Sequence, residues 1–254
     1  MEAEVSFDYV IIIIAVVTFT IGGVAKGAMG FGLPLIAIPM LTAFGSLPLA
    51  LSIAVPPVVA TNLWQIWKFR HHRNVAFLRR FLIVGSVGLV LGAVLLKNIN
   101  NAFLEIALGC LVLSYLLRST RSQSTMSPER TNILAPYMGG VAGVVHGTTG
   151  LSGMVGTPFF LATGIARPAF IFCNSMMFIL FSSLHLPALA MVGLFDKSAF
   201  FIGVLAVVPA FGGLWLGNRF GENVKDTTFL KLVQATLAVA AILPIWNGLS
   251  KLFA

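Results

Sequence analysis

Hydrophobic residues run along this chain in long blocks, separated by short polar or glycine-rich stretches. Crossing the hydrocarbon core of a bilayer as a helix takes about 20 predominantly apolar residues, with about 17 as the lower limit. The apolar segments are 8–26, 31–45, 47–67, 81–97, 102–117, 132–146, 153–165, 168–192, 197–217 and 228–247. This pattern predicts an all-α, multi-pass membrane bundle. Segments 31–45 and 153–165 are short, so we expect either half-helices that turn back or short packed spans.

The charged residues support the membrane assignment. Only 9% of the residues are charged, whereas a soluble domain has about 25%. Half of the basic residues lie in two loops: Lys68, Arg70, Arg73, Arg79, Arg80, Arg118, Arg121 and Arg130. Such clusters mark cytoplasmic loops, so the net charge of +8 does not indicate a nucleic-acid partner. Cys110 and Cys173 are isolated, so neither a disulfide framework nor a metal site is expected.

The two halves of the chain repeat the same features in the same order. Residues 22–25 and 139–142 both read Gly-Gly-Val-Ala. Residues 88–92 read Gly-Leu-Val-Leu-Gly, and 213–217 read Gly-Leu-Trp-Leu-Gly. Internal repeats are common in transporter folds, and the shared order of these matches indicates a duplication.

The predicted repeats are residues 1–118 and 132–254, joined by a cytoplasmic linker at 119–131. Each holds five segments, and an odd number places the two repeats in opposite orientations. The basic loop 68–80 agrees with this, because its counterpart at 193–198 is not basic and would therefore lie outside. We predict inverted repeats in the cytoplasmic membrane, with both termini outside.

The strongest pointers to a binding site are the glycine-rich breaks at 22–32 and 139–150. Paired, glycine-interrupted segments in corresponding places of two halves are typical of transporter sites. A short helix that begins after such a break directs its N–H groups and its positive dipole end at a cavity, which suits an anion. Gly30 and Gly32 are therefore candidate binding residues. The alternative is that these glycines only allow close helix packing.

Lys26 and His146 are the ionisable residues at the two breaks. An ionisable residue inside a membrane segment is a functional hypothesis by default. Lys26 would bind the anion, or else its side chain would extend to the cytoplasmic surface. His146 would bind an anion when protonated, or relay protons, because histidine titrates near physiological pH. A neutral, hydrogen-bonded core histidine is the alternative.

Polar side chains supply further candidates for substrate binding. Hydroxyl groups gather at the second break, and amides lie on segment 47–67 and on its counterpart, 168–192. These candidates are Asn62, Gln65, Thr148, Thr149, Ser152 and Asn174. Interhelical hydrogen bonding would explain the same residue types equally well.

One short motif points to another class of protein. Residues 150–153 read Gly-Leu-Ser-Gly, which fits rhomboid-type intramembrane serine proteases, with His185 as a base for Ser152. Four-residue matches arise easily in a Gly/Ser-rich break, and a protease does not require a duplicated unit. No Walker A pattern is present in the sequence, so ATP does not drive the protein directly.

The chain resembles the sulfite exporter TauE/SafE family. Residues 22–34, Gly-Gly-Val-Ala-Lys-Gly-Ala-Met-Gly-Phe-Gly-Leu-Pro, are similar to its opening motif. The second copy, with His146 and Thr149, and the Asn-Leu-Trp-Gln phrase at 62–65 extend the resemblance. The resemblance implies transport of sulfite, organosulfonates or related anions across the cytoplasmic membrane. Ser-Gly-Met at 152–154 replaces a longer glycine run of many relatives.

Together these patterns predict a secondary transporter of small anions, not an enzyme, with a central site at the two helix breaks. The runner-up is a passive anion channel, and the intramembrane serine protease comes third. The expected partners are a small anion and the lipid bilayer, and no cofactor or nucleic acid is expected. A coupled proton or other ion and a homodimer are further candidate partners.

Overall fold

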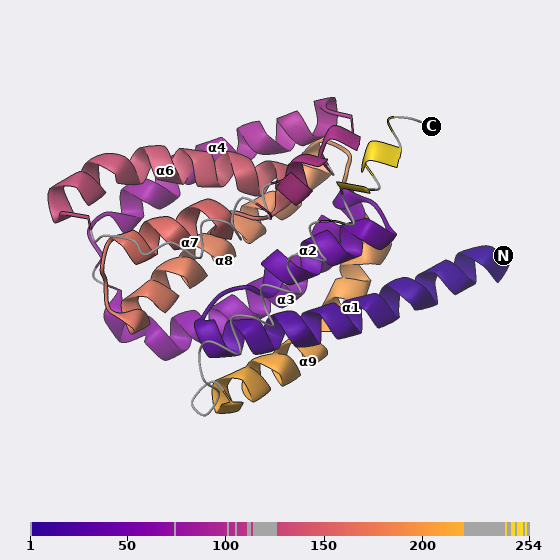
Figure 1. Ribbon diagram of the computed structural model, residues 1–254, viewed down its shortest axis with the longest axis horizontal. Coiled ribbons are helices and arrows are strands. Elements are labelled where there is room, and N and C mark those ends of the chain that lie inside the picture. The colour runs from indigo at the N-terminus through magenta and orange to yellow at the C-terminus, as the bar shows by residue number, and fades with distance from the viewer. Residues whose placement is uncertain are drawn as a thin grey trace. The chain divides into compact units, whose positions relative to one another are not determined.

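The structure is a computed structural model, shown in Figure 1. It describes residues 2–73, 75–100, 102–104, 106–110, 113, 126–220, 242, 245–246, 248–250 and 252. Most of the predicted segment 228–247 and of the predicted linker 119–131, and nearly half of the predicted segment 102–117, lie outside the described residues.

Every regular element in the described residues is a helix, which confirms the all-α prediction. The elements are α1 (Glu2–Met29), α2 (Leu33–Phe44), α3 (Leu47–Phe69), the short 3₁₀ helix η1 (Arg70–His72), α4 (Leu78–Asn98), α6 (Pro128–Thr149), α7 (Gly153–Ala162), α8 (Arg167–Met191) and α9 (Lys197–Phe220). Among the described residues, five stretches are long and apolar enough to cross a membrane: Tyr9–Met29, Leu47–His72, Leu78–Asn98, Arg167–Met191 and Lys197–Arg219.

The two predicted short segments form two short helices. α2 has 12 residues and α7 has 10. At 1.5 Å per residue they span about 18 and 15 Å, roughly half of the 30 Å hydrocarbon core. Neither helix is therefore long enough to cross the membrane by itself.

The ends of α1 and α6 are set by the backbone and not by hydropathy. Gly30 (φ 87°) and Gly150 (φ 74°) follow the two helices in the left-handed conformation, which glycine adopts without steric penalty. In each case the glycine N–H donates to the carbonyl four residues earlier, at Lys26 and His146. α6 begins where Ser127 caps it, because the Ser127 hydroxyl accepts from the N–H of Arg130.

The residues divide into two compact units. Unit 1 comprises Met1–Pro57, Asn100–Leu116 and Asp196–Ala254, and unit 2 comprises Val58–Ile99 and Leu117–Phe195. Unit 1 therefore contains α1, α2, the start of α3 and α9. Unit 2 contains the rest of α3, η1, α4, α6, α7 and α8. Each unit combines helices from both predicted repeats.

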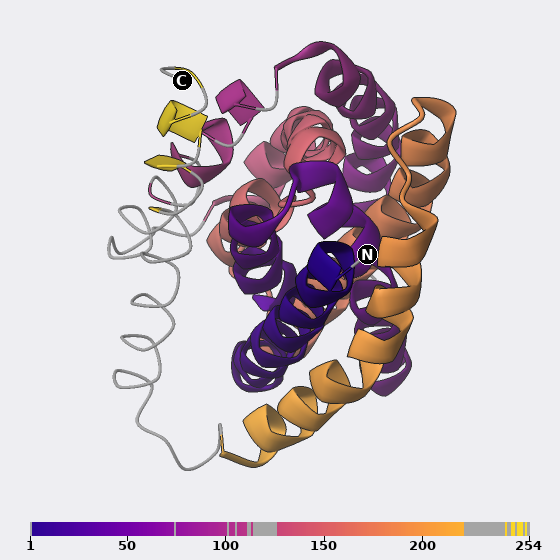
Figure 2. The same ribbon diagram turned by 90° about the vertical axis from the view of Figure 1, so that its right-hand side faces the viewer.

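Glycines bring α1 and α9 into backbone contact in unit 1 (Figure 1). A Cβ at Gly23 would overlap the carbonyl oxygen of Ala210, and one at Gly213 would overlap that of Thr20. Figure 2 shows the same two helices from another side, α1 in indigo and α9 in orange. Contacts this close are possible only without side chains, as in small-residue packing between membrane helices.

Unit 2 contains the same kind of crossing between α4 and α6. A Cβ at Gly143 would overlap the carbonyl oxygen of Gly85, and one at Gly88 would overlap that of Gly140. The pattern continues at Gly147, which packs against Leu89. Figure 1 shows the two helices side by side.

The two crossings share one register. The carbonyl of Thr20 faces Gly213 in unit 1, and the carbonyl of Gly140 faces Gly88 in unit 2. Residues of α1 therefore correspond to residues of α6 that lie 120 positions later. Gly88 and Gly213 likewise correspond, an offset of 125 residues from α4 to α9. Each of the four glycine–carbonyl contacts of the unit 1 crossing has a counterpart in unit 2 at these two offsets. Position for position, the helix pair of unit 2 therefore repeats the helix pair of unit 1.

Aromatic rings hold α7 against its neighbours in unit 2. Phe81 of α4 stacks on Phe159 of α7 at 5.7 Å between ring centroids, and lies 4.9 Å from the ring of Phe160. On its other side Phe81 stacks on Phe181 of α8 at 6.5 Å. Aromatic pairs at these separations contribute beyond their buried area. The cluster fixes α7, and with it the start of α7 beside the end of α6.

Candidate functional site

The second break brings together two of the predicted site residues. His146 lies in the last turn of α6 and is 2% exposed. Its Nδ1 is 2.9 Å from the Oγ of Ser152, the residue just before α7. Ser152 is fully buried. The turn at Gly150 thus places a hydroxyl group on the imidazole ring six residues earlier in the chain.

His185 of α8 completes this group and is not among the predicted binding residues. Its ring lies 5.1 Å from the ring of His146, edge to face, and it is 1% exposed. Its Nε2 donates to the carbonyl of Gly147 at 3.1 Å, since a carbonyl can only accept. Ser152 is hydrogen-bonded to His146 and not to His185, the base that the protease motif would use. An ionisable residue in an apolar segment was the available signal for His185.

The two threonines at the second break bond to the backbone. The Thr148 hydroxyl donates to the carbonyls of Val144 and Val145, and that of Thr149 donates to Val145. Thr149 also accepts from the N–H of Leu151 at 3.3 Å. These hydroxyls therefore shape the end of α6 and the turn that follows it.

The predicted amides on α3 are both buried. Asn62 donates to the carbonyl of Val58, one turn earlier in its own helix, at 2.7 Å. Gln65 accepts from the hydroxyl of Ser175 on α8 at 2.9 Å. One of the two amides thus forms an interhelical hydrogen bond, as the packing alternative described.

Asn174 on α8 bonds to a residue that sequence reasoning missed. Its Oδ1 accepts from the Thr157 hydroxyl of α7 at 2.7 Å, and its Nδ2 donates to Phe170 at 3.2 Å. Thr157 and Asn174 are both fully buried. No local pattern identifies Thr157, because this pairing exists only through the packing of α7 on α8.

The first break, in unit 1, has the same backbone form. Lys26 lies in the last turn of α1, as His146 does in α6. Its side chain is 1% exposed, so it does not extend to the protein surface as the alternative reading required. Gly32 (φ 116°) then caps α2, and Pro34 lies in the first turn. In that turn the N–H group of Leu33 has no acceptor within the helix, and Pro34 has no N–H group to donate.

The glycines of the two breaks serve two different purposes. Gly30, Gly32 and Gly150 have positive φ and form the turns themselves. Gly23 and Gly143 lie inside continuous helices and allow the helix crossings. The breaks are therefore shorter than the predicted 22–32 and 139–150. The packing alternative accounts for glycines within the helices, and the break prediction accounts for those at the turns.

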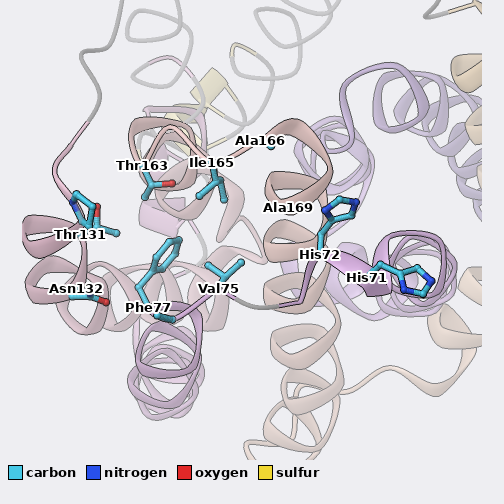
Figure 3. Close-up of a pocket in the computed structure, with 12 residues that line it drawn as sticks. His71, His72, Val75, Phe77, Thr131, Asn132, Thr163, Ile165, Ala166 and Ala169 are labelled. Atoms are coloured by element: carbon cyan, nitrogen blue, oxygen red, sulfur yellow. The ribbon is translucent and has the colours of Figure 1, made fainter.

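A cavity of about 510 Å³ lies elsewhere in unit 2, beside η1 and the first turns of α6 and α8. Figure 3 shows Val75, Phe77 and Ile165 around it, while the ring of His71 points away from them. None of the residues predicted to bind substrate lines this cavity. Among the described residues, no three His, Cys, Asp or Glu side chains gather as metal ligands would.

Comparison with known protein families agrees with this architecture. The family described as sulfite exporter TauE/SafE matches residues 14–243, a range that includes both breaks. No curated protein and no solved structure matches the chain. The family consists of membrane transporters and not enzymes, and membership implies a small anionic substrate. The chain is a multi-pass membrane transporter that belongs to the sulfite exporter TauE/SafE family.

Proposed function

We propose that this protein is a secondary carrier that exports a small sulfur-containing anion, such as sulfite or an organosulfonate, and binds it at the two helix breaks. One observation carries the proposal. Lys26 and His146, the buried basic groups at the two breaks, stand in equivalent places four residues before Gly30 and Gly150. Each is followed by a helix too short to cross the membrane.

The chemistry at each break suits an oxyanion. The first turns of α2 and α7 provide the positive end of a helix dipole, worth about 0.3–1 kcal/mol when exposed and up to about 2 when partly buried. α2 also provides N–H groups without helical acceptors, whereas in α7 this holds for Gly153 alone, because the next three N–H groups donate to the carbonyls of Leu151 and Ser152. A hydrogen bond to a charged group contributes about 1.5–3 kcal/mol. Lys26 in unit 1, and His146 with Ser152 in unit 2, would provide such bonds. Charge and directed donors together favour an anion with several oxygen atoms.

The other predicted residues have a secondary part in the proposal. Gly32 allows the chain to turn into α2, so that substrate can approach the backbone. The polar side chains already hold hydrogen bonds within unit 2, which a passing anion would have to replace. These side chains are Asn62, Gln65, Thr148, Thr149 and Asn174. We propose that they line the path of the substrate.

We further propose that the chain is an inverted duplication with both termini outside. The shared register of the two glycine crossings supports the duplication. The basic loop 68–80 and its non-basic counterpart at 193–198 support the inversion. Cysteines introduced at Ser6 and within loop 119–128 are expected to react with impermeant reagents from opposite sides of the membrane. Labelling from the same side would contradict the inversion.

Binding to the purified protein tests the substrate class. Sulfite, sulfate, thiosulfate, taurine and sulfoacetate are added in turn, and the unfolding temperature is measured. A ligand of the folded state raises apparent stability by mass action, about 2.7 kcal/mol at 100 times its Kd. We expect stabilisation by at least one sulfur oxyanion or sulfonate, and none by chloride at the same ionic strength. Stabilisation by none of the five would overturn the proposal.

Counterflow in proteoliposomes separates the carrier from the channel. Unlabelled anion inside the vesicles accelerates the uptake of labelled anion by a carrier, and has no such effect on a passive channel. We expect this acceleration, and its absence would favour the channel. The proposal includes coupling to a proton or another ion, and a homodimer that the mass of the purified protein in lipid would reveal.

A further inference from the structure

The two buried histidines of unit 2 stand apart from its other ionisable groups. Of the ionisable side chains in the described part of unit 2, only His146, Cys173 and His185 are buried. Every Lys and Arg there is exposed, and so are Tyr137 and the other two histidines. Cys173 lies 12 residues before His185 on α8, about 18 Å along the helix. The two imidazoles therefore have only each other as close ionisable neighbours within this part of the unit.

Within the described part of unit 2, each element around the pair presents uncharged groups to it. α4 presents the backbone of Leu89 and Gly92 to the helix turn at Gly147. α8 presents the rings of Phe178 and Phe181 to His146 at 6.4 and 5.6 Å. The residue before α7 contributes the Ser152 hydroxyl, and α8 also contributes His185 itself.

The pair can hold one proton and not two. The ring centroids are 5.1 Å apart in a buried setting, where two like charges repel strongly. Groups that interact this strongly take up protons in two widely separated steps. The hydrogen bonds around the pair accommodate the first step. The Ser152 hydroxyl can donate to or accept from Nδ1 of His146, and Gly147 already accepts from Nε2 of His185.

Unit 2 offers no buried carboxylate to balance that proton. Glu129 is the one carboxylate in its described part, and it is exposed. Glu129 lies 17 residues before His146 on α6, about 25 Å away along the helix. A buried charge without a counter-charge is strongly disfavoured. An anion bound at the second break would supply the missing negative charge.

We propose that each anion binds together with one proton from solution, held by the pair formed by His146 and His185. This inference rests on the proposed function and adds to it the coupling ion, its number and a second residue of the site. Because binding linkage is reciprocal, the proton strengthens anion binding as much as the anion strengthens proton binding. Above the pH at which the pair titrates in the free protein, affinity should fall about tenfold per pH unit, the slope for one proton.

Calorimetry on the full-length protein in lipid nanodiscs counts the protons. Sulfoacetate is titrated in two buffers of different ionisation enthalpy, between about pH 6 and 8, where the sulfonate and carboxylate of the probe stay ionised. We expect uptake of up to one proton per anion and the tenfold slope. The double variant His146→Gln/His185→Gln should take up none and show affinity independent of pH. The matched control is His71→Gln/His72→Gln, which removes the two exposed histidines and should behave as the native protein does.

The control variant His71→Gln/His72→Gln also allows a test that does not require the variant His146→Gln/His185→Gln to fold. The chain has four histidines, so the control retains only the buried pair. In its ¹⁵N-histidine NMR spectrum at about pH 7, sulfoacetate should convert one neutral imidazole to imidazolium and leave the other neutral. Anion binding without proton uptake, uptake of two protons, or a normal pH slope in the His146→Gln/His185→Gln variant would overturn this inference alone. No binding of any sulfur anion at any pH would overturn the proposed function as well.

Discussion

The two helix breaks share a backbone and differ in their side chains. Where unit 2 places an imidazole and a hydroxyl group, His146 and Ser152, unit 1 places an ammonium group, Lys26, and at the position equivalent to Ser152 a glycine, Gly32. The helix packing around the two breaks is the same, because in each unit glycines let two helices make backbone contact. The comparison teaches that a duplicated scaffold can keep its geometry while each copy acquires its own way of presenting positive charge.

The largest expected effect concerns the glycine-mediated helix crossing that each unit contains. Gly143→Val in unit 2 and Gly23→Val in unit 1 each introduce side-chain atoms where the backbone of the partner helix already lies. Overpacking costs about 1–3 kcal/mol, and more where the neighbour is backbone that cannot move aside. We expect each variant to lose about 3 kcal/mol of unfolding free energy, measured by thermal or denaturant unfolding in detergent.

Gly212→Ala serves as the control for both variants. Gly212 lies in α9 with open space around its Cβ position, so alanine should leave stability unchanged or raise it by up to about 1 kcal/mol. If only one of the two crossings proved sensitive to valine, the equivalence of the two units would be wrong.

The next effect concerns the turns. Gly30→Ala and Gly150→Ala place a Cβ in the left-handed region, which costs about 1–2 kcal/mol. We expect that loss of stability together with a large loss of anion flux in proteoliposomes, because the turns aim α2 and α7. Gly193→Ala is the matched control: Gly193 has the same kind of φ (77°), with nothing near its Cβ position, in a loop after α8. It should lose similar stability and retain flux. Normal flux in both break variants would make these turns structural only.

The smallest effect on anion binding concerns the hydroxyl group that unit 1 lacks. Ser152→Ala removes the hydrogen bond to His146 and leaves a buried ring nitrogen without that partner. We expect a loss of about 1–3 kcal/mol in stability and less than tenfold in affinity for sulfoacetate. Ser86→Ala is the control, since its hydroxyl donates only to Leu82 in its own helix. A hundredfold loss of affinity in Ser152→Ala would make Ser152, and not His146, the principal group at this break.

Hydropathy and glycine patterns predict the helices well and their ends less well. The starts of α2 and α7 agree with the predicted segments because a turn signal precedes each. The ends of α1 and α6 were predicted too early, at 26 and 146, whereas the helices continue to Met29 and Thr149. The backbone conformation of the glycine that follows each helix decides where that helix ends, and this conformation cannot be predicted from the polarity of the side chains.

Register and long-range pairing required the structure. Aligning the two Gly-Gly-Val-Ala phrases pairs Gly22 with Gly139, whereas the crossing contacts pair each residue of α1 with one 120 positions later. Gln65 and Ser175 are 110 residues apart in sequence and meet only because α3 packs on α8. The sequence predicted that Lys26 and His146 correspond. It did not predict that His185 joins His146, because that contact depends on which face of α8 turns inward.

The most direct test of the central claim, that the buried basic groups at both breaks bind the anion, is the affinity of Lys26→Met for sulfoacetate measured from about pH 6 to 8. Removing the ammonium should weaken binding by about 1.5–3 kcal/mol, or one to two decades, at every pH, while the pH slope assigned to unit 2 persists. Lys26→Arg should recover only part of the loss, because a planar guanidinium does not replace a compact ammonium. Lys97→Met, at an exposed lysine of α4, should bind as the native protein does. Unchanged affinity in Lys26→Met would contradict the account.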